Sequence, residues 1–139
     1  MRVQKFLANH SSLSRRQVEG LIDAGEITVN GKVIKPGHSV REGDTIRYQG
    51  RSWCVQLDDK PEEAVLLYHK PVGEIVTRSD EKNRPTVFAQ LPRAPGGKWI
   101  AIGRLDINTQ GLIIFVNDGD LAHKLMHPQA NLIRRYKVR

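Results

Sequence analysis

The sequence predicts an α+β fold, in which a small unit of helices and a β-hairpin precedes a domain dominated by antiparallel strands. Two observations support this. Two short segments with apolar residues at helical spacing are followed by β-rich runs on either side of Asn30-Gly31, and further β-rich runs are spread over residues 65–139. The chain has 139 residues, about one domain's length, which is enough to bury a core.

Two helices are expected at the start of the chain. The first is indicated by the spacing of its apolar residues, Val3, Phe6 and Leu7. The second has the form of a capping box, with Ser14 as N-cap and Gln17 reaching back to it. Gly25 is placed to end this second helix.

A hairpin should follow, because Ile27–Val29 and Lys32–Ile34 flank Asn30-Gly31, the strongest short hairpin signal in a sequence. Thr45–Tyr48 is expected to add a strand and to complete a first domain over residues 1–50. The acidic, Pro61-containing stretch 51–64 is interpreted as a linker.

The remaining residues, 65–139, are assigned to a second domain. The expected elements are strands at 65–68, 74–77, 99–102 and 112–116, a helical turn at 86–91, a short helix at 121–126 and the opening of a strand at 136–138.

The charge of the chain favours a polyanionic partner. The 22 Lys and Arg residues outnumber the 15 Asp and Glu residues and give a net charge of +7, which points first to nucleic acid and second to an anionic membrane surface.

No apolar run approaches the roughly 20 residues of a membrane-spanning helix. Cys54 is the single cysteine, so an intrachain disulfide is impossible and a reducing cytoplasm is expected; we expect its side chain to be buried.

Basic residues gather near the starts of the two expected helices, at Arg2, Lys5, Arg15 and Arg16. Arg15 and Arg16 fall in a first helical turn, where the helix dipole favours acids, so they are candidates for meeting phosphates. The plainer interpretation is a solvated polar face.

The first 48 residues resemble the S4 RNA-binding domain. The resemblance rests on Lys5-Phe6-Leu7, Ser14-Arg15-Arg16, residues 27–32 and Gly43-Asp44, in that order. It implies that Lys5, Arg15, Arg16 and Lys32 face structured RNA. Because this domain occurs on several unrelated proteins, it indicates the partner and not the reaction.

A carboxylate with potential chemistry follows the expected strand at 99–102. Gly103-Arg104-Leu105-Asp106 places Asp106 on a loop, two residues from a guanidinium that favours its charged form. Such a group can act as nucleophile, general base or metal ligand. Taken alone, it is more often a turn or capping aspartate.

The segments around Asp106 are similar to the RsuA-type ribosomal RNA pseudouridine synthases, within that family most closely to the large-subunit branch. The similarity rests on residues 68–73, 84–88, 102–106, 109–112, 117–119 and 125–128. It implies an isomerase without a cofactor, with Asp106 as nucleophile, Arg104 displacing or replacing the target base in the stem, and Tyr136 stacking on the everted uracil. Whether the aspartate attacks the ribose or the uracil, or drives elimination to a glycal, stays open.

The resemblance also implies that the catalytic domain continues past residue 139, so we expect a fragment that need not be active alone. The expected partner is ribosomal RNA, with no membrane, metal or cofactor, and a monomer is the default.

His123 and His127 have the i, i+4 spacing of one helix face, which could bind a metal, but no third ligand accompanies them. The rival hypothesis is a non-catalytic RNA-binding or ribosome-associated protein, in which Asp106 is a turn residue.

Overall fold

The computed structural model describes residues 1–58 and 62–138. The chain divides into two compact units, one formed by Met1–Glu62 with Pro95–Lys98 and the other by Glu63–Ala94 with Trp99–Arg139. Each unit has its own sheet and its own core. No helix in the described part of the chain has the length and apolar character that a bilayer crossing requires.

The first unit begins with two helices, α1 (Val3–His10) and α2 (Arg15–Asp23). The predicted capping box is confirmed: the Gln17 amide donates to Ser14 Oγ at 3.2 Å and the Ser14 amide donates to Gln17 Oε1 at 2.8 Å. Gly25 follows α2 with φ +73° and its amide donates to Ile22 O, so it ends the helix as expected.

The sheet of this unit is antiparallel, with strand order β2-β1-β3-β4. Its strands are β1 (Thr28–Val29), β2 (Lys32–Val33), β3 (Thr45–Tyr48) and β4 (Arg51–Cys54). Asn30 and Gly31 both have positive φ, 50° and 79°, as a type I′ turn needs, which confirms the hairpin. The core between helices and sheet holds side chains such as Phe6, Leu7 and Ile46.

The predicted linker at 51–64 is wrong at its start. Arg51–Cys54 is a strand paired with β3, and Val55 is fully buried in the core of the first unit. Burial of Val55 and the ladder to β3 stabilise this segment as part of the unit. Cys54 is exposed rather than buried, because it lies on the solvent side of β4. Residues 59–61 of the predicted linker lie outside the described residues.

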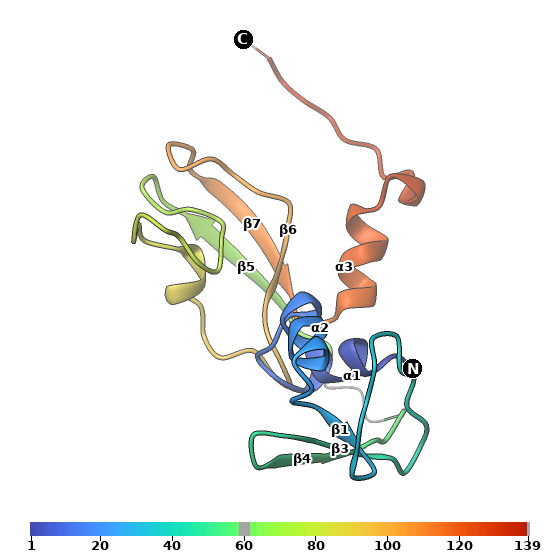
Figure 1. Ribbon diagram of the computed structural model, residues 1–139. Coiled ribbons are helices and arrows are strands. Elements are labelled where there is room, and N and C mark those ends of the chain that lie inside the picture. The colour runs from blue at the N-terminus through green and yellow to red at the C-terminus, as the bar shows by residue number, and fades with distance from the viewer. Residues whose placement is uncertain (59–61, 139) are drawn as a thin grey trace. The chain divides into compact units, whose positions relative to one another are not determined.

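The second unit contains a sheet of order β5-β7-β6, also antiparallel. Its strands are β5 (Val65–Lys70), β6 (Ile100–Ile102) and the central β7 (Gly111–Val116), which Figure 1 shows side by side. The register pairs Val65 with Val116 at one end and Lys70 with Gly111 at the other. The chain therefore leaves β5 and enters β7 at the same end of the sheet.

The helical elements of this unit are η1 (Val87–Ala89), α3 (Gly119–Met126) and η2 (Pro128–Ala130). The aromatic ring of Phe115 is fully buried in the core, and Tyr68 and Phe88 meet its ring edge to face. Trp99 is also buried, and its indole N–H donates to Pro92 O at 2.7 Å.

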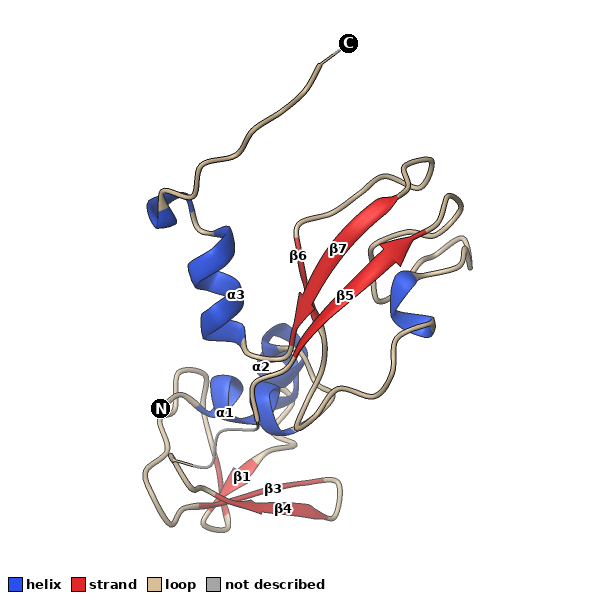
Figure 2. Ribbon diagram, turned by 180° about the vertical axis from the view of Figure 1, so that it is seen from behind, coloured by secondary structure: helices blue, strands red, loops and turns tan. Residues whose placement is uncertain are grey.

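Two predicted strands of this unit are wrong. Residues 74–77 do not form a strand; Ile75 makes a single parallel bridge to Thr86. Residues 136–138 are irregular and exposed, and in Figures 1 and 2 the chain beyond η2 runs away from the sheet. A segment without a neighbouring strand leaves its ladder hydrogen bonds unmade, so β-rich composition alone does not make it a strand.

Candidate functional site

Asp106 lies on the loop that joins β6 to β7. Gly103 begins this loop with φ +87°, a conformation that favours glycine. Leu105 packs against the core of the second unit and Ile107 is half-buried, whereas Asp106 between them is exposed. Because the side chains of both apolar neighbours are partly buried, the loop is held at the surface of the unit and the residue between them is exposed to solvent.

Hydrogen bonds to its backbone carbonyl groups fix this loop, one from a backbone amide and one from a lysine side chain. The Gly73 amide donates to Ile107 O at 2.7 Å, which joins the loop to the connection that follows β5. The Lys70 ammonium donates to Thr109 O at 2.6 Å and to Pro71 O at 2.8 Å. The Thr109 amide donates to Asp106 O at 3.0 Å, which closes a turn starting at the aspartate.

The carboxylate of Asp106 is not used by that turn. Two other aspartates of the chain have structural partners: Asp118 accepts from the Leu121 amide at 2.6 Å at the start of α3, and Asp44 accepts from the Arg41 amide at 2.8 Å. Within residues 1–58 and 62–138, the Asp106 side chain makes no hydrogen bond or ion pair. The interpretation of Asp106 as a capping residue therefore lacks the contact that would define it.

Arg104 and Tyr136 are both exposed. Arg104 follows Gly103 at the start of the Asp106 loop, and Tyr136 lies in the terminal segment, the irregular residues 131–138 after η2. Within the described part of the chain, Arg104 makes no ion pair with Asp106. Tyr136 is 79% exposed, and its segment stands apart from the β6–β7 connection in both views of the ribbon. The structure thus places Arg104 and Asp106 on one loop but does not bring Tyr136 to them.

One polar pair joins β5 to the connection that follows it, and a second pair lies within that connection, which runs to η1. The Tyr68 hydroxyl donates to Glu74 Oε2 at 2.6 Å, and burial together with this carboxylate raises the pKa of Tyr68 to about 12. Asp80 pairs with Arg84 at 2.7 Å, and the hydrogen bonds from Arg84 lower the pKa of Asp80 to about 2. Tyr68 therefore stays a neutral donor and Asp80 a charged acceptor over the physiological range.

In the first unit, Lys5 and Arg15 lie on one surface depression of about 470 Å³. Arg2, which sequence reasoning noticed but did not select, shares it, together with Gln4 and Glu19 at hydrogen-bond distance from each other. Arg16 is exposed in the first turn of α2, and Lys32 is exposed on β2. Lys5 and Arg15 are thus brought together, while Arg16 and Lys32 stand outside the depression.

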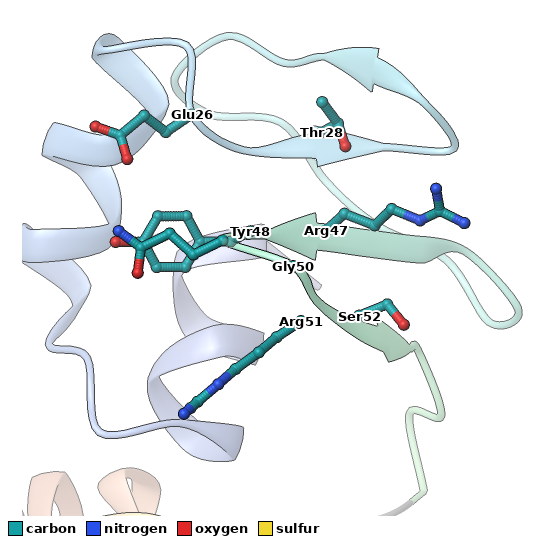
Figure 3. Close-up of a pocket in the computed structure, with 8 residues that line it drawn as sticks. Glu26, Thr28, Arg47, Tyr48, Gly50, Arg51 and Ser52 are labelled. Carbon is teal, nitrogen blue, oxygen red and sulfur yellow. The ribbon is translucent and has the colours of Figure 1, made fainter.

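Sequence reasoning missed a second basic surface on the same unit, a hollow of about 440 Å³ against β3 and β4. The register sets Arg47 opposite both Thr28 and Ser52, and Figure 3 shows its side chain extending from β3 between their strands. Arg51 reaches the hollow from the start of β4. The available signal was the pair of arginines, Arg47 and Arg51, on either side of Gln49-Gly50.

The rings of His123 and His127 lie 4.6 Å apart. In the part of the chain that the structure describes, no group of at least three His, Cys, Asp or Glu side chains has the arrangement of a metal site.

Comparison with known proteins identifies both units. The family model for the S4 domain matches residues 1–46, and the model for RNA pseudouridylate synthase matches residues 64–139. The second match covers the sheet of the second unit, the loop with Asp106 and the terminal segment. The chain belongs to the RNA pseudouridylate synthase family.

Curated relatives in this family align over nearly the whole chain. The ribosomal large subunit pseudouridine synthase B of Xanthomonas axonopodis pv. citri is 49% identical over 99% of this chain and 25% of its own length. The protein of that name from Escherichia coli K12 is 46% identical over 99% of this chain and 48% of its own length. The chain thus spans about half, or less, of the length of these relatives.

A solved structure described as a pseudouridylate synthase aligns with 93% of this chain and 54% of its own length, at 25% identity and a TM-score of 0.46.

Proposed function

We propose that the protein isomerises a specific uridine in a stem-loop of large-subunit ribosomal RNA to pseudouridine, with Asp106 as the nucleophile. The observation that carries the proposal is an exposed aspartate, unused by any structural contact in the described chain, inside the segment that matches the RNA pseudouridylate synthase family. The substrate class is taken from relatives named as large-subunit enzymes.

The reaction is an isomerisation that conserves every atom. The bond between ribose C1′ and uracil N1 breaks, the base turns, and a bond from C1′ to C5 forms while a proton leaves C5 and one is taken up at N1. An ionised carboxylate suits this reaction because it can form a covalent intermediate and leave again. The proposal assigns no metal or cofactor to these steps.

A uridine inside a stem has to leave the stack before a carboxylate can reach it, at a cost of a few kcal/mol. We assign Arg104, on the same loop as Asp106, to displacing the base or filling its place. Tyr136 is assigned to stacking on the everted uracil, which recovers about 1–3 kcal/mol. This role requires the terminal segment to approach the Asp106 loop when RNA is bound.

The first unit is assigned to holding the RNA through its phosphates. Lys5 and Arg15 share a basic depression, Arg16 extends from the N-terminal turn of α2, and Lys32 projects from the hairpin. Cations at such positions contribute an affinity for RNA that depends strongly on salt concentration and little on the RNA sequence.

The enzyme is proposed to act as a monomer, in the cytoplasm, where ribosomal RNA is made and assembled in a bacterium.

The test is Asp106→Asn in the complete gene product, because the carboxamide keeps the size of the side chain and removes its charge. Large-subunit RNA from cells that lack the gene serves as substrate, and pseudouridine is mapped nucleotide by nucleotide. We expect normal RNA binding and no product. Turnover by the variant would refute the nucleophile, and RNA binding without product by the wild type would favour the non-catalytic RNA-binding alternative.

A further inference from the structure

The hollow against β3 and β4 carries two arginines that the proposed function leaves without a role. This surface, the β3–β4 hollow, is lined by Glu26, Thr28 and residues 47–52. Arg47 and Arg51 are both exposed there. Within residues 1–58 and 62–138, neither guanidinium makes an ion pair or a hydrogen bond. Two positive charges that the described chain does not neutralise favour an anionic partner at this surface.

The register of the sheet places short hydroxyl side chains beside Arg47. Thr28 on β1 and Ser52 on β4 both stand directly opposite it, so the three side chains lie on one face of the sheet. The neighbouring side chains of Val29 and Ile46 point the other way, into the core that α1 and α2 cover. Arg47 therefore lies on the face turned away from these helices. The two hydroxyl groups can add hydrogen bonds to an oxygen anion that the guanidinium holds.

Arg51 reaches the hollow from a different direction. It stands opposite Tyr48, one position along the ladder from the pair of Arg47 and Ser52, so its side chain leaves the ladder on the other face. Figure 3 shows the side chains of the two arginines pointing apart. Two separated cations suit successive phosphates of an extended backbone better than one small anion, which both would have to contact together.

The rest of the lining favours a nucleic acid over a protein. Glu26 is the one acid among the described residues of the lining; its carboxylate points away from the Arg47 guanidinium in Figure 3. The other side chains are polar apart from Tyr48, whose ring packs against the core. A protein partner is typically held through a desolvated aromatic or apolar anchor, which this lining does not offer.

We propose that the β3–β4 hollow is a second phosphate-binding surface for RNA, in which Arg47 and Arg51 hold separate phosphates. The inference rests on RNA as the substrate under the proposed function, but not on Asp106 or on catalysis. The depression with Lys5 and Arg15 is lined by residues of α1, α2 and the chain start, whereas Arg47 lies on the sheet face turned away from those helices. An RNA that contacts both surfaces therefore has to reach around the unit, so the test uses a long RNA.

The first test measures binding of the complete gene product to large-subunit ribosomal RNA from cells that lack the gene. Arg47→Gln/Arg51→Gln removes two charges at exposed strand positions, and Lys35→Gln/Arg41→Gln removes the same charge from exposed positions elsewhere on the unit. Circular dichroism checks that both variants are folded. Two lost phosphate contacts should reduce the slope of log affinity against log salt by about 1.4–1.8. The control should keep the wild-type slope.

Cys54 provides a second readout in which every arginine stays in place. It is exposed and lies two residues after Ser52 on β4, so its side chain projects from the face that carries Arg47. An iron–EDTA group tethered to Cys54 generates hydroxyl radicals, which cleave RNA strands close to it. We expect cleavage of the bound large-subunit RNA at defined nucleotides, and no such cleavage with a Cys54→Ser protein treated in the same way.

An unchanged salt slope for Arg47→Gln/Arg51→Gln, or an equal change in the control, would overturn the proposal. Absence of cleavage that depends on Cys54 would overturn it as well. Weaker binding of poly-glutamate by the arginine variant, with an unchanged RNA slope, would assign the hollow to an acidic protein instead. Pseudouridine mapping tests the proposed function separately: a wild-type protein that forms no product but shows the expected slopes and cleavage would refute that function and retain the phosphate-binding hollow.

Discussion

Replacement of Arg15 and Arg16 by alanine should weaken RNA binding in a way that depends on salt. Both side chains are exposed in the first turn of α2, and Arg15 shares a basic depression with Lys5 and Arg2. Alanine is a good helix former, and the Ser14 capping box uses Gln17 rather than either arginine, so the helix should survive the change. The effect is therefore expected in binding and not in folding.

The magnitude follows from counterion release. Each phosphate contact contributes about 0.7–0.9 to the slope of log affinity against log salt, so two lost contacts reduce the slope by about 1.4–1.8. Between about 50 and 200 mM salt, a fourfold change, the affinity advantage of the wild type over the variant should then shrink by about 7–12-fold.

The assay is a series of binding isotherms with a ribosomal RNA stem-loop at several salt concentrations. Lys35→Ala/Arg41→Ala is the matched control, because it removes the same charge from two exposed positions of the same unit. An unchanged slope for the Arg15/Arg16 variant would refute the interpretation that these residues bind phosphates. An equal change of slope in the control would show that net charge matters and not position.

Three further predictions concern the fold. Ser14→Ala should lower the free energy of unfolding of the first unit by about 1 kcal/mol, measured by denaturant titration, whereas the exposed Ser12→Ala should not. Phe115→Ala should cost about 3–5 kcal/mol in the second unit by the same method, because a fully buried ring leaves a cavity. Arg84→Gln should raise the pKa of Asp80 from about 2 toward its ordinary value of 3.8 in an NMR titration. Because the folded-state pKa is depressed, this pair stabilises the fold above about pH 4 and stops doing so as the pH falls through about 2; an unchanged pKa in the variant would contradict this.

The local elements of the first unit could be predicted because their determinants lie within a few residues. The Ser14 capping box and the Asn30-Gly31 turn are each specified by side chains or φ preferences at neighbouring positions. The strand Arg51–Cys54 was missed because its turn, Gln49-Gly50, uses a glutamine at φ +46°, a residue that gives little turn signal. The acidic residues and Pro61 that follow this strand then favoured the interpretation of the whole stretch 51–64 as a linker.

The elements of the second unit were harder to predict from the sequence, because they depend on partners that are distant along the chain. Residues 74–77 have β-rich composition, but only Ile75 finds a partner, at Thr86. The exposed position of Asp106 followed from the loop motif. Burial of Lys70 did not, since lysine is rarely buried and its carbonyl partners at 71 and 109 converge only when β5 and β7 are in register.

Under the proposed function, the exposed arginines of the first unit and the loop-borne carboxylate of the second unit would separate RNA affinity from the choice of uridine. The proposed phosphate contacts of Arg15 and Arg16 would position the RNA without reading its bases, so their loss should reduce binding to target and non-target stems alike. Discrimination then has to come from groups that meet the extruded base, and among the exposed candidates Arg104 lies on the Asp106 loop itself. Arg104→Ala should therefore lower kcat at the target uridine far more than it lowers affinity for the RNA. A variant that lost only affinity would place Arg104 with the phosphate-binding cations and leave the selection of the uridine to other residues.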